Sequence, residues 1–131
     1  MTEGGGILGR METSQIAVER ENGIGVVSVH GEHDLNTSDP LADKLSKEID
    51  DGMPIVLDLT PASFIDSSIL RVVLDARRRA GEAGHGFEVA AGEGTGEGVL
   101  RVLEVTGLST TLPVLPSRDE AIKRVSAGSS T

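Results

Sequence analysis

Two apolar stretches open the patterned part of the chain, at residues 16–18 and 24–30. Both predict strands, and Asn22-Gly23 between them is the strongest short signal for a tight hairpin turn. Side chains alternate between the two faces of a strand, so Val27 and Val29 share one face of the second stretch. The chain is therefore expected to begin its fold with a β-hairpin.

A helix is predicted downstream of a polar loop over residues 31–39. Ser38 or Asp39 can cap it, and Pro40 suits its first turn, because a backbone N–H has no partner there. The apolar positions that follow share one helical face: Leu41, Leu45 and Ile49. Gly52 then suits the left-handed position at which a helix ends.

The next stretch joins a buried strand to a second helix. Residues 55–59 are a short apolar run bounded by prolines, which suits a strand covered on both faces. Residues 60–63 have loop composition, and Phe64 and Ile65 return to the core. Three N-cap candidates follow: Asp66, Ser67 and Ser68. An apolar helical face comes after them: Ile69, Val72, Val73, Ala76 and Ala80. The sequence thus presents a small hydroxyl at the start of a helix.

The remaining segments alternate between strand and helix. They are a strand over 87–90, a flexible loop over 91–98, a helix over 99–105 stopped by Gly107, and a strand over 112–115. Pro113 confines that strand to a sheet edge. Ser117 can cap a final helix, with Glu120 as its capping-box partner. A hairpin followed by alternating strands and helices predicts an α/β fold with one mixed sheet of four to five strands and about four helices.

The length of 131 residues suits one domain, expected over 15–126 between a flexible leader (1–14) and a flexible tail (127–131). Hydrophobic residues make up 37% of the chain, but only two residues are aromatic, so the core must be built from Val, Ile, Leu and Ala. The chain has no cysteine, which excludes disulfides and thiol chemistry.

A net charge of −9 argues against a nucleic-acid ligand, because phosphate contacts need clustered Lys and Arg. The basic cluster Arg77-Arg78-Arg79 falls near a helix C-terminus, where cations favour the helix dipole. No apolar run approaches the length of a membrane span, and residues 1–10 do not have the pattern of a signal peptide. A cytoplasmic protein without a membrane partner is expected.

Three short motifs follow one another along the chain: GEHDLNT at residues 31–37, FIDSSIL at 64–70 and VLEVTGL at 102–108. They resemble motifs of the STAS family of anti-sigma factor antagonists. FIDSSIL is similar to the family signature F-(I/M)-D-S-S-G-L. Residues 31–37, GEHDLNT, resemble G-E-L-D-x-x-T, and residues 102–108, VLEVTGL, resemble the late helix ending in (L/V)-T-G-L. Together the matches cover about residues 16–125. The resemblance implies a single domain whose sheet is covered chiefly on one face by helices.

The resemblance also implies a function without catalysis. The antagonist binds an anti-sigma factor that is also an ATP-dependent serine kinase, and so frees a sigma factor for transcription. Phosphorylation ends that binding and a serine phosphatase restores it. By resemblance the phosphorylated residue is Ser67, with Ser68 as the second choice. The nucleotide belongs to the kinase, so no cofactor is expected on this chain. The partner surface would include Asp34, Asn36, Asp66, Ser67, Ser68, Ile69 and Arg71.

The chain departs from the family pattern at three positions, and simpler interpretations of its motif residues are also open. Ile69 replaces the usual Gly, Arg71 a small residue, and His33 the usual Leu. A bulky Ile69 could obstruct the kinase or tune which kinase fits. Ser67 could instead only cap a helix, and Asp34 could only bond its own backbone in an Asx turn. The chain would then be a STAS scaffold that is never phosphorylated, or a subunit of a larger signalling or transport assembly.

Other chemistries find little support in the residue spacing. His30, Glu32, His33 and Asp34 match no strong metal motif. The glycines of residues 92–98 follow GxGxGxG and lie beside glutamates without a Lys, unlike phosphate-binding loops. A hydrolase would need His30, His33 or His85 as the base for Ser67, and the chain lacks the G-x-S-x-G elbow. No metal site and no enzymatic activity are expected.

Overall fold

The computed structural model describes residues 14–106 and 114–128. Several parts of the predictions lie outside the described residues. They are residues 1–13 of the leader predicted over 1–14, Gly107 and Leu108 of the third motif, Leu112 and Pro113 of the predicted last strand, and residues 129–131 of the predicted tail.

The predicted hairpin is confirmed. Strands β1 (Ser14–Glu21) and β2 (Ile24–His33) pair antiparallel. Asn22 and Gly23 both have positive φ angles, of 55° and 78°, as a two-residue turn matched to the strand twist requires. The predicted shared face of Val27 and Val29 is confirmed too, because both lie in the larger core cluster.

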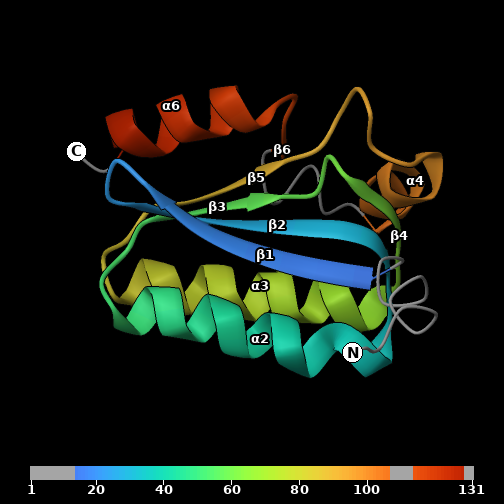
Figure 1. Cartoon of the computed structure of the whole chain (residues 1–131), viewed down its shortest axis with the longest axis horizontal. Helices are drawn as coiled ribbons and strands as arrows, with labels where there is room; N and C mark the ends of the chain where they lie inside the picture. Colours follow the sequence, from blue (N-terminus) through green and yellow to red (C-terminus); the bar gives the residue numbers. More distant parts are fainter. Residues whose placement is uncertain (1–13, 107–113, 129–131) are drawn as a thin grey trace, which may run out of the picture.

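The sheet continues from the hairpin through parallel strands (Figure 1). These are β3 (Ile55–Asp58), β4 (Ala62–Ile65), β5 (Phe87–Ala90) and β6 (Val114–Leu115). The strand order is β1-β2-β3-β5-β6, and β4 pairs with the end of β2 beyond a bulge at Gly31/Glu32. The sheet therefore has six strands rather than four to five, because residues 62–63, expected to be loop, belong to β4.

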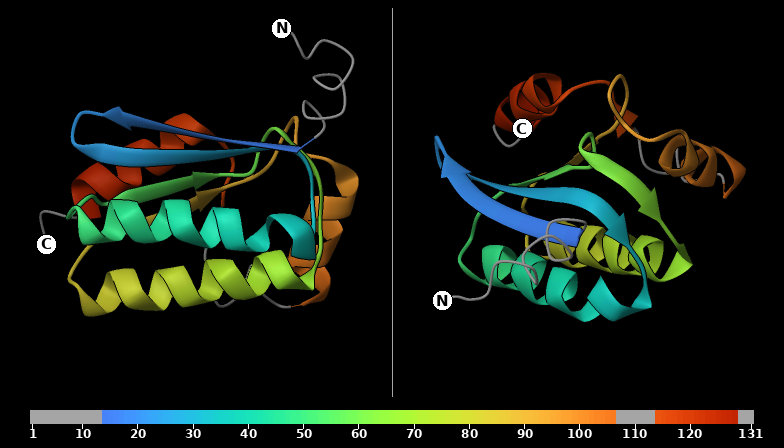
Figure 2. Two further views of the ribbon diagram at one scale, coloured as in Figure 1. Left: turned by 60° about the horizontal axis from the view of Figure 1, so that its bottom comes forward. Right: turned by 45° about the vertical axis from the view of Figure 1, so that its right-hand side comes forward.

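Four helices are described, and they cover both faces of the sheet. They are α2 (Leu35–Asp50), α3 (Ser67–Glu82), α4 (Glu97–Val105) and α6 (Arg118–Gly128). The two longest, α2 and α3, lie side by side on one face, α6 lies on the other, and α4 packs beside β4 (Figures 1 and 2). The predicted α/β fold is confirmed. Helix α6 makes the coverage less one-sided than expected.

The core divides between these two faces. The larger cluster joins the sheet to α2, α3 and α4, and its fully buried members include Val29, Leu41, Leu57, Ile69 and Val99. A smaller cluster lies under α6: Ile24, Val26, Val56, Ala90, Ala121 and Val125. A sheet buried on both faces explains why β3 is a continuous apolar run rather than an alternating one.

Helix α2 begins earlier than the sequence predicted. Asp34 is its N-cap, so the expected loop over 31–39 is mostly strand and helix, and neither Ser38 nor Asp39 is the cap. Pro40 lies inside the helix rather than in its first turn. The error arose because several residues before Pro40 can each cap a helix, and the sequence alone does not rank them.

One further expectation about local structure was wrong. Phe64 was predicted to be in the core, but 44% of its surface is exposed because it alternates with the buried Ile65 along β4. In the glycine loop over 91–98, which was predicted to be flexible, two glycines pack closely against neighbouring backbone. A Cβ on Gly96 would lie 2.5 Å from the carbonyl oxygen of Ser63, and one on Gly92 would lie 2.6 Å from that of Pro116. The glycines there allow close backbone approach.

The cap of the last helix agrees with the prediction. The hydroxyl of Ser117 accepts a hydrogen bond from the backbone N–H of Glu120 at 3.1 Å. Arg118 then ties the start of α6 to the hairpin through Glu19, at 2.6 Å, and Glu21, at 3.3 Å. Helix α6 continues to Gly128, two residues past the predicted domain boundary.

Candidate functional site

The N-terminal ends of α2 and α3 lie at the same end of the molecule (Figure 2). Asp66 is the N-cap of α3, and its Oδ1 accepts hydrogen bonds from the backbone N–H groups of Ser68, at 3.0 Å, and Ile69, at 3.3 Å. The hydroxyl of Ser68 donates to the same Oδ1 at 2.5 Å. Of the three N-cap candidates in the sequence, Asp66 is therefore the N-cap of α3, and Ser67 is the first residue of the helix.

These contacts lower the pKa of the Asp66 carboxyl below its ordinary value of 3.8. The hydrogen bond from the Ser68 hydroxyl is the largest cause, and partial burial opposes it. Backbone N–H groups of Ile69, Ser68 and Leu35 lower the pKa further. Because Leu35 begins α2, the carboxylate of Asp66 faces the starts of both helices.

The two serines have different environments. The Ser68 hydroxyl is bound to Asp66 and its side chain is half-buried, whereas Ser67 is exposed. Among the residues that the structure describes, no hydrogen-bond partner of the Ser67 hydroxyl is found. Ser67 thus offers a free hydroxyl to solvent, and the interpretation that it only caps α3 is wrong, since Asp66 caps the helix.

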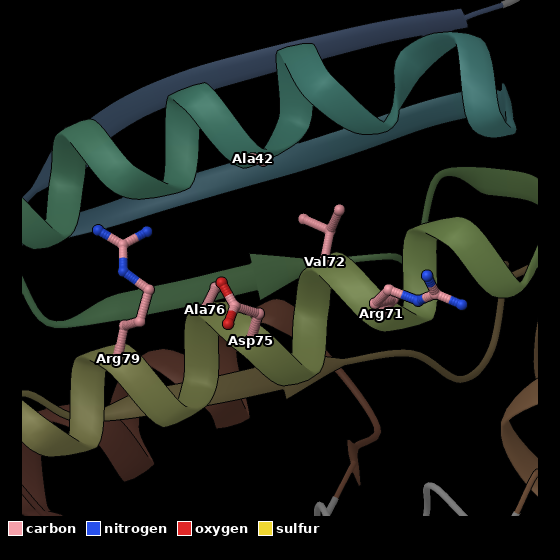
Figure 3. Close-up of a pocket in the computed structure, with 6 residues that line it drawn as sticks. All are labelled: Ala42, Arg71, Val72, Asp75, Ala76 and Arg79. Carbon is pink, nitrogen blue, oxygen red and sulfur yellow. The ribbon is translucent and has the colours of Figure 1, made fainter.

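Ser67 borders a hollow of about 470 Å³ between the two helices. Its lining residues are Leu35, Ser38, Asp39, Asp66, Ser67, Ser68, Arg71 and Val72. A second hollow of about 300 Å³ continues along α3 and is drawn in Figure 3, lined by Ala42, Arg71, Val72, Asp75, Ala76 and Arg79. Because Arg71 and Val72 line both, the two hollows form one groove between α2 and α3, with Ser67 at one end.

Asp34, the N-cap of α2, and Asn36, in its first turn, are both exposed. Oδ1 of Asp34 accepts a hydrogen bond from the Asn36 backbone N–H at 2.9 Å, and Oγ1 of Thr37 accepts one from the Asp34 N–H at 3.1 Å. The Asx-type backbone bond foreseen for Asp34 is therefore present, and it caps a helix. The residue nonetheless remains exposed, so a partner can also reach it.

Sequence reasoning missed the structural role of His33. Its side chain is only 1% exposed, and its Nδ1 lies 3.0 Å from Oγ1 of Thr37. Its Nε2 lies 2.8 Å from the carbonyl oxygen of His30, to which a protonated Nε2 donates. The histidine therefore supports the turn that starts α2. The spacing Asp34-x-x-Thr37 resembles a capping box and could have indicated this turn.

Two departures from the family motif, Ile69 and Arg71, differ in their exposure to solvent. Ile69 is 0% exposed and packs in the core, so the prediction that it contacts a partner or obstructs a kinase is wrong. Arg71 is exposed and lines the groove. The predicted partner-binding residues Asp34, Asn36, Ser67 and Arg71 are exposed, and Asp66 and Ser68 are half-buried.

Two of the three histidines considered as a hydrolase base, His33 and His85, are poorly placed to serve Ser67. Both ring nitrogens of His33 have other partners, and His85 follows the far end of α3, about 24 Å along a helix of this length from Ser67. Within 14–106 and 114–128, no group of three or more His, Cys, Asp or Glu side chains is placed to hold a metal ion.

The model of the STAS domain family matches residues 15–121. The chain belongs to the STAS domain family. An anti-sigma factor antagonist from Mycobacterium paratuberculosis is 31% identical to this STAS domain. The match covers 87% of this chain and 95% of that one, with a TM-score of 0.77. The phosphorylated form of the Bacillus cell fate determinant SpoIIAA is 23% identical, with coverage of 85% and 99% and a TM-score of 0.64. This STAS domain is thus similar to anti-sigma factor antagonists.

The same fold also occurs as a small part of a longer chain. SLC26A9 matches 81% of this STAS domain with 16% identity and a TM-score of 0.64, but the match covers 20% of SLC26A9. No curated protein sequence gives a significant match. Among the described helices, none has the length and apolarity needed to cross a membrane.

Proposed function

We propose that this STAS domain is an anti-sigma factor antagonist whose binding to an anti-sigma serine kinase is switched by phosphorylation of Ser67. The observation that carries the proposal is the free, exposed hydroxyl of Ser67 beside the bound hydroxyl of Ser68. A kinase needs a hydroxyl that it can reach without breaking the fold. The similarity over nearly the whole chain to the M. paratuberculosis antagonist supports the same function.

The unphosphorylated surface around Ser67 suits protein binding. Leu35 is 72% exposed at the start of α2, next to the groove that Ser67 and Arg71 border. An exposed leucine beside charged and polar side chains is typical of a protein contact with an apolar centre and a polar rim. In the proposed complex, this surface meets the kinase and displaces the sigma factor.

Phosphorylation would change that surface while leaving the fold intact. A phosphate adds about −1.5 to −2 charges, and the N-terminal end of a helix tolerates negative charge because its free N–H groups and dipole favour it. A 100-fold loss of affinity requires about 2.8 kcal/mol of binding free energy. New charge that must be desolvated in an interface can supply a penalty of that size. A serine phosphatase would restore the binding form.

The nucleotide in this cycle belongs to the partner. The kinase binds ATP, the bond between its β- and γ-phosphates breaks, and the γ-phosphoryl group forms a bond to the Ser67 oxygen. ADP leaves from the kinase and the hydroxyl proton passes to a base of the kinase, so this chain acts as substrate and inhibitor rather than as catalyst. It needs no cofactor of its own in that role.

The test is the affinity of wild type, Ser67→Ala and Ser67→Asp for the anti-sigma kinases of the same organism, measured by titration calorimetry. Wild type and the alanine variant should bind alike, and the aspartate variant should bind at least about tenfold more weakly, which corresponds to about 1.4 kcal/mol. Ser68→Asp adds the same charge one residue along and controls for position. Equal affinities of Ser67→Ala and Ser67→Asp for the kinase would contradict the switch.

A second candidate is a STAS scaffold that is never phosphorylated and works as part of a larger assembly. The similarity to one-fifth of SLC26A9 supports this alternative, as does Arg71 in place of the usual small residue. It predicts equal binding by all three Ser67 forms. It also predicts that incubation with the cognate kinase and ATP leaves the Ser67 peptide unmodified by mass spectrometry.

A further inference from the structure

We propose that Arg71 binds the phosphate of phosphorylated Ser67 within the same chain, as an ion pair along the first turn of α3. This inference rests on the proposed modification of Ser67 and adds a residue to its regulation. Ser67 and Arg71 are four residues apart on one helix, so their side chains lie on the same face one turn apart. Both are exposed, and both line the hollow of about 470 Å³.

The side chain of Arg71 is directed for this contact. Figure 3 shows its guanidinium extended toward the N-terminal end of α3, where Ser67 lies. Long side chains on helices commonly lean toward the N-terminus, over the preceding turn. The order also matters, because an acidic group four residues N-terminal to a basic one is the more favourable arrangement on a helix.

Within 14–106 and 114–128, Arg71 forms no ion pair in the unmodified protein. The structure pairs Asp75, one turn further along, with Arg78 at 2.5 Å, and Arg78 also pairs with Glu82 at 3.1 Å. Among the described residues, no carboxylate lies within ion-pair distance of the Arg71 guanidinium. A new anion at Ser67 would therefore not have to displace an existing partner.

The charges around the hollow make Arg71 the natural partner of the phosphate. Two carboxylates, Asp39 and Asp66, line the hollow with Ser67, and Arg71 is the cation among its described lining residues. A phosphate dianion would be repelled by both carboxylates and attracted by the guanidinium. Guanidinium and phosphate also match in geometry, because two parallel N–H groups can donate to two phosphate oxygens.

This contact would change the partner surface in two ways at once. The phosphate adds negative charge at one end of the groove, and it also holds the Arg71 guanidinium in an ion pair. A kinase that uses the free guanidinium would lose that contact as well as meeting the new charge. The switch would then not depend on electrostatic repulsion alone.

The experiment places phosphoserine at position 67 genetically, in wild type and in Arg71→Gln, and titrates the phosphate by ³¹P NMR. The ion pair favours the dianion, so the second pKa of the phosphate should be lower in wild type than in Arg71→Gln by about 0.5. Arg77→Gln is the matched control, because Arg77 is exposed on the same helix but borders a different hollow. It should titrate like wild type.

Equal phosphate pKa values in wild type and Arg71→Gln would overturn the inference. A second readout is the Arg71 Nε–H signal in ¹H–¹⁵N spectra, which should shift on going from serine to phosphoserine and stay unchanged if no contact forms. Neither measurement uses a kinase. If kinases fail to modify Ser67 while the ion pair is present, the proposed function fails and the contact stands. If kinases modify Ser67 and the pKa values are equal, only the contact fails.

Discussion

The Asp66 carboxylate accepts the Ser68 hydroxyl at 2.5 Å, and this contact separates two neighbouring serines into a bound one and a free one. Both serines lie in the first turn of α3, and in the sequence both looked equally able to cap the helix. Because the carboxylate already takes the capping position, the Ser67 hydroxyl has no hydrogen bond among the described residues to lose on modification. The side-chain hydrogen bond to Asp66 therefore distinguishes the two hydroxyls.

The first prediction concerns which serine a kinase modifies. Incubated with the cognate kinase and ATP, Ser68→Ala should incorporate one phosphate as wild type does, and Ser67→Ala should incorporate none. The reason is that Ser68 must break its hydrogen bond to Asp66 before it can react. Intact-mass and peptide mass spectrometry measure the outcome. Phosphate on Ser68 in the wild-type chain would contradict it.

The second prediction concerns stability and its pH dependence. Asp66→Ala should lower the free energy of unfolding at pH 7 by about 1 kcal/mol, the usual effect of losing an N-cap. The folded pKa of Asp66 lies below its ordinary value of 3.8, so its contribution is complete above that pH and is lost as pH falls through the folded value. Urea unfolding at pH 7, 5, 4 and 3 should show the difference between wild type and Asp66→Ala shrinking toward pH 3.

The control for this prediction is Asp66→Asn. Asparagine keeps an oxygen that can accept from the first turn but carries no titrating group. Its difference from Asp66→Ala should stay nearly constant over the same pH range. A difference between wild type and Asp66→Ala that does not change with pH would show that the charge of Asp66 contributes nothing.

The third prediction concerns the glycine loop that leads into α4. Gly96→Ala should destabilise the protein by about 2 kcal/mol or more, because its Cβ would lie 2.5 Å from the carbonyl oxygen of Ser63 and the backbone must move. Gly98→Ala is the matched control, since its nearest contacts are at 3.9 Å and alanine favours the helix that it joins. Thermal unfolding should show a lower Tm for the first variant and an equal or higher one for the second.

Much of the fold could be predicted because its signals are local. The Asn22-Gly23 turn requires two positive φ angles, and few dipeptides adopt them readily, so the hairpin follows from two residues. The Ser67 site was proposed on a different ground, the resemblance of residues 64–70 to the STAS signature. The local pattern itself indicated only a cap residue, a small hydroxyl and an apolar helical face.

What could not be predicted depends on contacts between distant segments. The pairing of β4 with β2 decides that Ile65 is buried and Phe64 exposed. Neither strand carries a sequence signal that identifies the other as its partner. The helical pattern placed Ile69 on the apolar face, whereas the family resemblance placed it on the partner surface. Its packing against the sheet beneath α3 decides for the core. The groove that joins Ser67 to Arg71 likewise exists only because α2 lies beside α3.

The last prediction concerns the buried histidine beneath the start of α2. His33→Leu restores the usual residue of the family and keeps a side chain of similar volume, but it removes the partner of the His30 carbonyl oxygen. It should therefore lower the free energy of unfolding by about 1 kcal/mol, whereas His33→Ala, which also leaves a cavity, should lower it by about 3 kcal/mol.

Chemical denaturation of both variants measures these effects. A double-mutant cycle that combines Thr37→Val with His33→Leu tests the contact between the two side chains. His33 and Thr37 lie 3.0 Å apart, so their single effects should not add. Additive effects in this cycle would mean that the hydrogen bond contributes nothing. In that case His33 would stabilise the turn through its volume and its bond to His30 alone.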